Sequence, residues 1–244
     1  MFFETIADNA SDWGPRLLAG LRLTLSLTAS SFCLAFVLAL LIEYLRSRRS
    51  FSARLVARVY IAVARGVPVL VILYLLYFAL PGAGITLSAV LAGSIGLAIV
   101  YAAYLAEVFR AGLSAIPPGQ REAALATGLT PLQTFRLILL PQALRHTVAP
   151  LLINLVSLMK DSSICALIAV PEMTLVSREL MSETFLPLHV FAMTAALYFC
   201  LAWPASLAAR AIERRLQEPV RRVSARRAKP VAVEVAASPR SAPL

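Results

Sequence analysis

Long apolar runs alternate with short polar segments along most of the chain. A run of about 20 apolar residues is long enough for a helix to cross the hydrocarbon core of a bilayer. Ser and Thr side chains inside such a run cost little, because they can bond back to helical carbonyls. Five runs predict transmembrane helices, at about residues 17–45, 59–80, 86–107, 147–170 and 188–210. We therefore expect an all-α polytopic membrane protein.

The five spans form one predicted transmembrane domain, residues 16–212. A polar segment, residues 1–15, precedes it and lacks the basic region of a cleaved signal peptide. Residues 213–244 follow it and are rich in Arg, Ala and Pro, with little apolar periodicity. Their composition predicts a basic, disordered tail.

Composition and charge agree with a membrane protein. Of the residues, 59% are hydrophobic and 15% are charged, whereas a soluble domain carries about 25% charged residues. The net charge of +10 could indicate nucleic acid, but the Arg residues cluster between the apolar runs and in the tail. We therefore expect a lipid membrane and no nucleic acid as the partner.

The distribution of Lys and Arg also predicts an orientation. Segments 46–58 and 110–145 hold five and four of these residues, whereas segments 81–86 and 171–187 hold none and one. Cytoplasmic loops carry the excess of positive charge. The N-terminus is therefore predicted outside, and the 110–145 loop and the C-terminal tail in the cytoplasm.

Residues 121–142 form an island of polar and small residues inside this hydrophobic chain. Glu122–Ala126 favours a short helix, and Gly128 stands where a residue in left-handed geometry would end it. Thr130–Pro131 predicts the N-cap and first turn of a second, amphipathic helix, which we expect Pro141 to disrupt. Such a helix pair could dock on a partner, or it could lie on the membrane surface as an ordinary amphipathic loop.

The island resembles the EAA loop of ABC importer permeases. That loop reads E-A-A, three residues, G, nine residues, I, one residue and L-P, and every position is matched here by Glu122, Ala123, Ala124, Gly128, Ile138, Leu140 and Pro141. Segments 104–110 and 160–164 are similar to those of the polar amino-acid subgroup, which includes histidine, glutamine, glutamate and arginine importers. Arg65–Pro68 resembles a further family motif, which has Thr at the position of Val67. The resemblance covers roughly residues 15–212.

This resemblance implies the permease subunit of an ABC importer for polar or charged amino acids, or for related compounds such as opines. It implies two cytoplasmic ATPase subunits, a second permease copy or paralogue, and a periplasmic or extracellular solute-binding protein, at a bacterial inner membrane. The loop between spans three and four would be the cytoplasmic coupling loop. Its residues toward the ATPase would be Glu122, Ala123, Ala124, Gly128, Ile138 and Pro141.

Motifs for catalysis and metal binding are missing from the sequence. The chain has two lysines, Lys160 and Lys229, and neither follows a glycine-rich loop that could bind nucleotide. No Cys/His spacing is typical of a metal site. We expect no catalytic residue, cofactor or metal, and ATP hydrolysis in a separate subunit. Two alternatives are an ATP-independent secondary transporter or channel and a docking protein that transports nothing, although the complete EAA spacing argues against both.

The fourth predicted span contains a charged and polar run, Lys160, Asp161, Ser162 and Ser163. A charge at the centre of a bilayer costs about 2.5–3.5 kcal/mol on insertion scales, so such residues usually face a cavity or a partner. One hypothesis is that the run breaks or frays the span and lines the translocation path or its gate, with Asn154 on the same face. The other is a structural ion pair to other helices. We interpret Arg65 as a cation that snorkels at a helix end.

Overall fold

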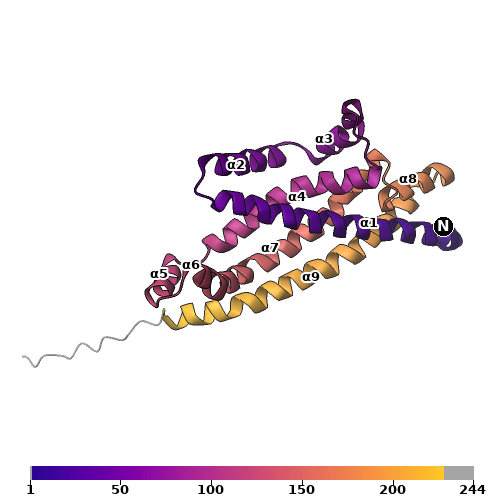
Figure 1. The fold of residues 1–244 in the computed structure, drawn as a ribbon. Helices are drawn as coiled ribbons and strands as arrows, with labels where there is room; N and C mark the ends of the chain where they lie inside the picture. The colour runs from indigo at the N-terminus through magenta and orange to yellow at the C-terminus, as the bar shows by residue number, and fades with distance from the viewer. Residues whose placement is uncertain (1, 228–244) are drawn as a thin grey trace, which may run out of the picture.

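The protein is built from helices, the long ones lying side by side (Figure 1). This computed structural model describes residues 2–227, with side chains as far as Arg215. Within that range no β-strand occurs, which confirms the all-α prediction. The α-helices are α1 (Phe2–Ser47), α2 (Phe51–Gly66), α3 (Val69–Tyr74), α4 (Ala89–Ser114), α5 (Pro118–Ala126), α6 (Pro131–Gln133), α7 (Leu140–Asp161), α8 (Met173–Thr184) and α9 (Pro187–Arg227).

Short stretches of other helix types extend or join these elements. Helix α3 continues as a π-helical turn, Leu75–Ala79, and a 3₁₀ turn, Leu80–Ala83. A second π-helical stretch, Thr134–Leu139, joins α6 to α7. A 3₁₀ helix, Ser162–Ile168, follows α7.

One predicted span is bent. Four helical stretches are long and apolar enough to cross a membrane, namely Phe2–Ser47, Ala89–Ser114, Pro131–Ile168 and Pro187–Arg215. The fifth, predicted at 59–80, is a pair in which α2 and the stretch Val69–Ala83 meet at 102°. Val67 is extended, with φ −99° and ψ 132°, because the residue before a proline avoids the helical region and Pro68 lacks an N–H. The span predicted at 59–80 therefore corresponds to a bent helix pair, and the bend itself was not predicted.

Two helices extend beyond their predicted ends. Helix α1 begins at Phe2, so it includes the segment that we expected to precede the first span. Trp13 in that segment is fully buried and packs with Leu17 and Met173. Helix α9 continues to Arg227, into the predicted disordered tail. Ala, Arg, Leu, Glu and Gln dominate the sequence at that point and favour helix. The remainder of the predicted tail, 228–244, lies outside the described residues.

Helix α4 is the central element and packs against α1, α2, α3 and α7. Its glycines allow neighbours to come close. A Cβ atom added at Gly96 would lie 2.6 Å from Cδ2 of Leu73, and one added at Gly93 would lie 3.2 Å from Sγ of Cys165. Small residues at a helix contact are a common means of packing helices in membranes. Helix α4 thereby fixes where the bent pair and α7 lie relative to each other.

The segment 171–187, expected only to connect two spans, contains helix α8. Its N-cap, Glu172, is fully buried. The carboxylate accepts hydrogen bonds from the Leu175 N–H and the Tyr198 hydroxyl, both at 2.9 Å. The Thr24 hydroxyl of α1 accepts a bond from the Met173 N–H at 3.2 Å. A polar network inside the protein therefore holds α1, α8 and α9 together.

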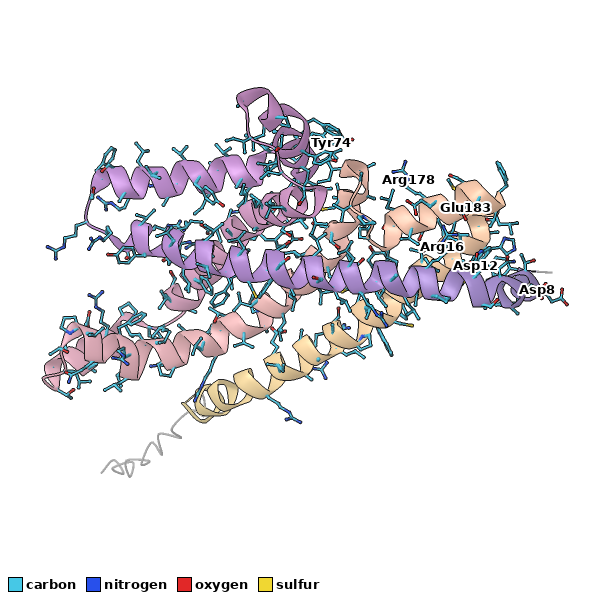
Figure 2. All side chains as sticks on the ribbon, turned by 45° about the vertical axis from the view of Figure 1, so that its right-hand side comes forward. Asp8, Asp12, Arg16, Tyr74, Arg178 and Glu183 are labelled. Carbon is cyan, nitrogen blue, oxygen red and sulfur yellow. The ribbon has the colours of Figure 1, made fainter. Side chains whose placement is uncertain are left out.

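An ion pair reinforces the same end of the molecule. Figure 2 shows Asp8, Asp12 and Arg16 of α1 at the end where Arg178 and Glu183 of α8 lie. The Arg16 guanidinium donates to both carboxylate oxygens of Glu183, at 2.6 and 2.7 Å. Bidentate pairs of this kind are the geometrically best defined ion pairs. Helix α8 is therefore tied to α1 at its surface as well as in its interior.

Candidate functional site

The predicted coupling loop lies at the end of the helices remote from α8 (Figure 1). Helix α5 begins at Pro118, whose missing N–H needs no partner in a first turn. The helix ends at Ala126, and Gly128, two residues later, is left-handed, with φ 86°. The Gly128 N–H donates to the Leu125 carbonyl at 3.0 Å, and the Leu129 N–H donates to the Ala124 carbonyl at 3.3 Å. This is a Schellman motif, and the geometry predicted for Gly128 is confirmed.

The second helix of the loop starts as predicted but does not stop where we expected. Thr130 and Gln133 form a capping box, with the Thr130 hydroxyl accepting from the Gln133 N–H at 3.3 Å and the Gln133 side chain accepting from the Thr130 N–H at 2.9 Å. The helix then passes through Thr134–Leu139 into α7, so Pro141 does not end it. The wider π-helical turn just before Pro141 makes room for its ring and needs no N–H from it.

The coupling positions divide between surface and interior. Four of them are exposed, namely Glu122, Ala123, Gly128 and Pro141. Ala124 is buried, and Ile138 is partly buried, where α5 packs on the π-helical stretch. Two leucines beside them, Leu132 and Leu137, expose 64% and 62% of their surface. An exposed apolar cluster next to a well-capped helix is typical of a contact surface.

A polar pocket of about 660 Å³ opens between α2, α4 and α7. Its polar lining residues are Arg65, Tyr104, Glu107, Arg110, His146 and Asn154. The Arg65 guanidinium carbon lies 5.4 Å from the centroid of the Tyr104 ring, which is a cation–π contact. Both α4 and α7 belong to stretches able to span a membrane. Polar side chains from two membrane-spanning stretches therefore face one pocket.

The acid in this pocket is already neutralised. Glu107 accepts from Nη1 of Arg46, on α1, at 2.7 Å and pairs with Nη2 of Arg110 at 2.8 Å. Arg65 has no carboxylate partner among the side chains that the structure describes. The pocket therefore carries an excess of positive charge, on Arg65. From the sequence we interpreted this residue as a snorkelling cation at a helix end.

The predicted path residues lie in two places. Asn154 lines the pocket, with its side-chain nitrogen donating to the Pro150 carbonyl at 2.9 Å. None of residues 160–163 lines that pocket. Asp161 accepts a bond from the Tyr101 hydroxyl of α4 at 2.7 Å, whereas Lys160 is exposed and makes no ion pair with any described side chain. The structure therefore does not bring Asn154 together with the Lys160–Ser163 run.

The run itself marks a change in helix type, as one hypothesis expected. The α-helix ends at Asp161, and the 3₁₀ helix that follows ends at Ile168, just before Ala169, which has φ 61°. Ser162 is buried and donates to the Met159 carbonyl at 2.7 Å, and Ser163 is partly buried. The ion pair of the other hypothesis is not found here among the described side chains, since the partner of Asp161 is a tyrosine.

Sequence reasoning missed two polar sites, the contact of Arg65 with Tyr104 and the buried Glu172. Each depends on residues far apart in the chain, so neither pairing has a local signature. One signal was available for Arg65. It stands inside a predicted span with no acid near it in the sequence, which is a stronger indication of a cavity or partner than of a border residue.

Comparisons with known proteins cover both the loop and the pocket. Residues 31–218 match the family described as binding-protein-dependent transport system inner membrane component. The chain is 38% identical over 187 residues to the probable amino-acid ABC transporter permease protein YckA of Bacillus subtilis (strain 168), covering 77% of this chain and 83% of that one. It is 36% identical over 194 residues to the octopine transport system permease protein OccM of Rhizobium meliloti, covering 76% and 79%.

A solved structure is similar over nearly its whole length. The crystal structure of an amino acid ABC transporter with histidines matches this fold with a TM-score of 0.82 at 32% sequence identity. The match covers 88% of this chain and 98% of that chain. The arrangement of helices described above is therefore shared with a known transporter.

Proposed function

Because the chain belongs to the family of inner membrane components of binding-protein-dependent transport systems, we propose that it is the permease subunit of an ATP-driven amino-acid importer. The observation that carries the proposal is helix α5. It is a short helix whose two ends are fixed by Pro118 and Gly128, while Glu122 and Ala123 are left exposed by the part of the chain that the structure describes. Such a helix is suited to being gripped and moved by another subunit.

The packing of α5 supplies a route for that movement. On one side, three residues separate α5 from the end of α4 at Ser114. On the other, Ala124 packs toward the π-helical stretch that leads into α7. The Schellman motif and the capping box keep the turn between these parts stiff. A shift of α5 would therefore be passed to α4 and α7, which together line the polar pocket.

The remaining subunits follow from this role. Two ATPase subunits would dock on α5 and its counterpart in a second permease copy or paralogue. The Arg-rich segments support a cytoplasmic position for α5 and an external N-terminus. A solute-binding protein would deliver substrate on the outer side, at the end around α8. The chain needs the ATPase as a partner because it has no nucleotide-binding loop of its own.

Amino acids, or close derivatives such as opines, are the proposed substrates. Support comes from the names of the relatives, one an amino-acid permease and one an octopine permease, and from the similarity to an amino acid transporter. A pocket with polar lining in otherwise apolar helices also suits a small, charged solute better than an apolar one. Polar and charged amino acids are therefore the first compounds to test.

The test is uptake into proteoliposomes. The permease is reconstituted with the ATPase and the solute-binding protein encoded beside it, and labelled amino acids and octopine are screened. We expect uptake that requires ATP inside, the binding protein outside, and a hydrolysable nucleotide. The matched control replaces ATP with a non-hydrolysable analogue.

Two results would contradict the proposal. Uptake that proceeds without the ATPase would show a secondary transporter or channel. An ATPase that co-purifies with the permease but gives no uptake of any tested amino acid would favour a docking protein.

A further inference from the structure

A second pocket, of about 440 Å³, lies where the C-terminal part of α1 meets α4 and α7. Its walls are mainly apolar. Phe36 of α1 and Phe109 of α4 meet edge to face in the wall, with ring centroids 5.3 Å apart. Leu40 and Leu144, which also line it, expose 50% and 49% of their surface. All three helices belong to stretches able to span a membrane, so the apolar compound that surrounds this pocket in a bilayer is lipid.

One acidic side chain interrupts the apolar lining. Among the described residues, four polar side chains line the pocket, and two of them are satisfied within their own helix. The Ser47 hydroxyl donates to the Tyr44 carbonyl at 2.8 Å, and the Thr147 hydroxyl donates to the Leu144 carbonyl at 3.2 Å. Glu43 differs, because its Oε2 atom is buried and accepts no hydrogen bond from any described group.

The cation nearest to Glu43 is bonded elsewhere. Nη1 of Arg46 lies 3.9 Å from Oε2 of Glu43, which is too far for a hydrogen bond. The same Nη1 donates to Oε1 of Glu107 at 2.7 Å. The Glu43 side chain exposes only 20% of its surface, and a carboxylate so far removed from water is costly without a donor. A ligand in the pocket could supply that donor.

A second cation stands at this end of the pocket. Arg48 follows α1 directly and folds back over Tyr44, with its guanidinium carbon 5.0 Å from the ring centroid. Tyr44 lines the pocket next to Glu43. Arg48 makes no ion pair with any described side chain, and a guanidinium is well suited to a phosphate group. The same end of the pocket therefore offers an acceptor for an ammonium group and a donor for a phosphate.

We propose that this pocket is a binding site for a phospholipid with a primary-amine headgroup, of which phosphatidylethanolamine is the probe to use. The ammonium group donates to Glu43, the phosphate pairs with Arg48, and an acyl chain lies along the apolar wall at Phe36 and Leu40. A choline headgroup carries the same positive charge but has no N–H donor. A glycerol headgroup has hydroxyl donors but no positive charge to balance Glu43. The site goes beyond the proposed function and does not depend on what is transported.

The experiment is native mass spectrometry of the full-length permease in detergent. The protein is exposed to equimolar phosphatidylethanolamine, phosphatidylcholine and phosphatidylglycerol with identical acyl chains, and the retained lipids are identified. The variants are Glu43→Gln and Leu144→Trp, the second of which narrows the pocket at a half-exposed lining position. The matched control is Glu179→Gln, which makes the same change on the exposed face of α8.

One charge-assisted hydrogen bond is worth roughly tenfold or more in affinity. We expect the wild type and Glu179→Gln to retain phosphatidylethanolamine about tenfold over the other two lipids, and Glu43→Gln to lose this preference. Leu144→Trp keeps the carboxylate but obstructs the acyl chain, so it should retain less phosphatidylethanolamine than the wild type. It also serves if Glu43→Gln does not fold.

Four results would overturn the inference. In the wild type they are equal retention of the ethanolamine and choline lipids, a preference for phosphatidylglycerol, or no retained lipid, as a second copy seated in the pocket would give. In the variants the contrary result is an unchanged preference in Glu43→Gln, or undiminished retention in Leu144→Trp where only that variant folds. None of these results bears on the importer proposal, which is tested by uptake.

Discussion

The two ends of the molecule differ in whether their characteristic side chains are buried or exposed. At the end around α8, Glu172 is fully buried and its carboxylate is bonded by Leu175 and Tyr198 of the same chain. At the end around α5, Glu122 and Ala123 face outward, and Leu132 exposes 64% of its surface. The first end contains a buried acid that the chain itself bonds, whereas the second presents an acid on an exposed, capped helix.

This difference separates residues that hold the fold from residues that act on partners. A buried, fully bonded acid is expensive to remove and contributes to stability. An exposed, capped helix contributes little to the core, and its value lies in where it points. Substitutions at the α8 end should therefore lower stability, while substitutions at the α5 end should alter transport at nearly constant stability.

The largest effect on stability should come from Glu172→Leu. It removes the N-cap of α8 and leaves the Leu175 N–H and Tyr198 hydroxyl without their partner, so we expect a loss of about 2–3 kcal/mol. Thermal unfolding of the detergent-solubilised permease measures it. The matched control is Glu179→Leu, which makes the same change on the exposed face of α8. Equal unfolding temperatures for the two variants would show that the buried network is not what holds this end.

A smaller effect is expected for Thr130→Ala at the other end. The substitution removes half of the capping box and should cost about 1 kcal/mol, confined to the start of α6. Hydrogen exchange should quicken at the amides of residues 132–134 and stay unchanged in α8. Gln133→Ala, which removes the reciprocal bond, should give a similar pattern. Faster exchange throughout the protein would mean that this end is part of the global core.

The smallest effect should come from Glu183→Gln. Arg16 lowers the pKa of the exposed Glu183 carboxyl by a bidentate hydrogen bond. The pair therefore contributes stability above the ordinary pKa of a glutamate, and this contribution disappears as the pH falls through the lowered pKa. The unfolding temperatures of wild type and Glu183→Gln should differ slightly at neutral pH and converge in acid. A difference that grows in acid would contradict the sign of this shift.

Local chemistry allowed much of the fold to be predicted from sequence. The spans follow from apolar runs of sufficient length, and the turn at Gly128 and the cap at Thr130 depend on residues within a few positions. The break at Val67–Pro68 also had a local signal, but the surrounding apolar run concealed it. Pro141 gave a local signal for the end of a helix, but the helix continues because the preceding π-helical turn accommodates the proline.

The parts that could not be predicted depend on long-range contacts. Glu172 is buried because Tyr198 and Thr24 reach it from other helices. The polar pocket exists because α4 brings Tyr104 under the Arg65 guanidinium, in a pocket that Asn154 of α7 also lines. Sequence shows that such residues are unusual in a membrane span, but only the packing of α4 shows which of them meet.

The central claim is that α5 couples ATP hydrolysis to transport, and Gly128→Val tests it most directly. A Cβ atom there would meet no other atom within 4 Å, so the substitution acts through the left-handed backbone alone. The measurement is amino acid taken up per ATP hydrolysed in proteoliposomes. The matched control is Gly119→Val, which also has open space and no positive φ. We predict that Gly128→Val hydrolyses ATP but transports about tenfold less per ATP, while Gly119→Val stays close to wild type. A wild-type ratio in Gly128→Val would contradict the account.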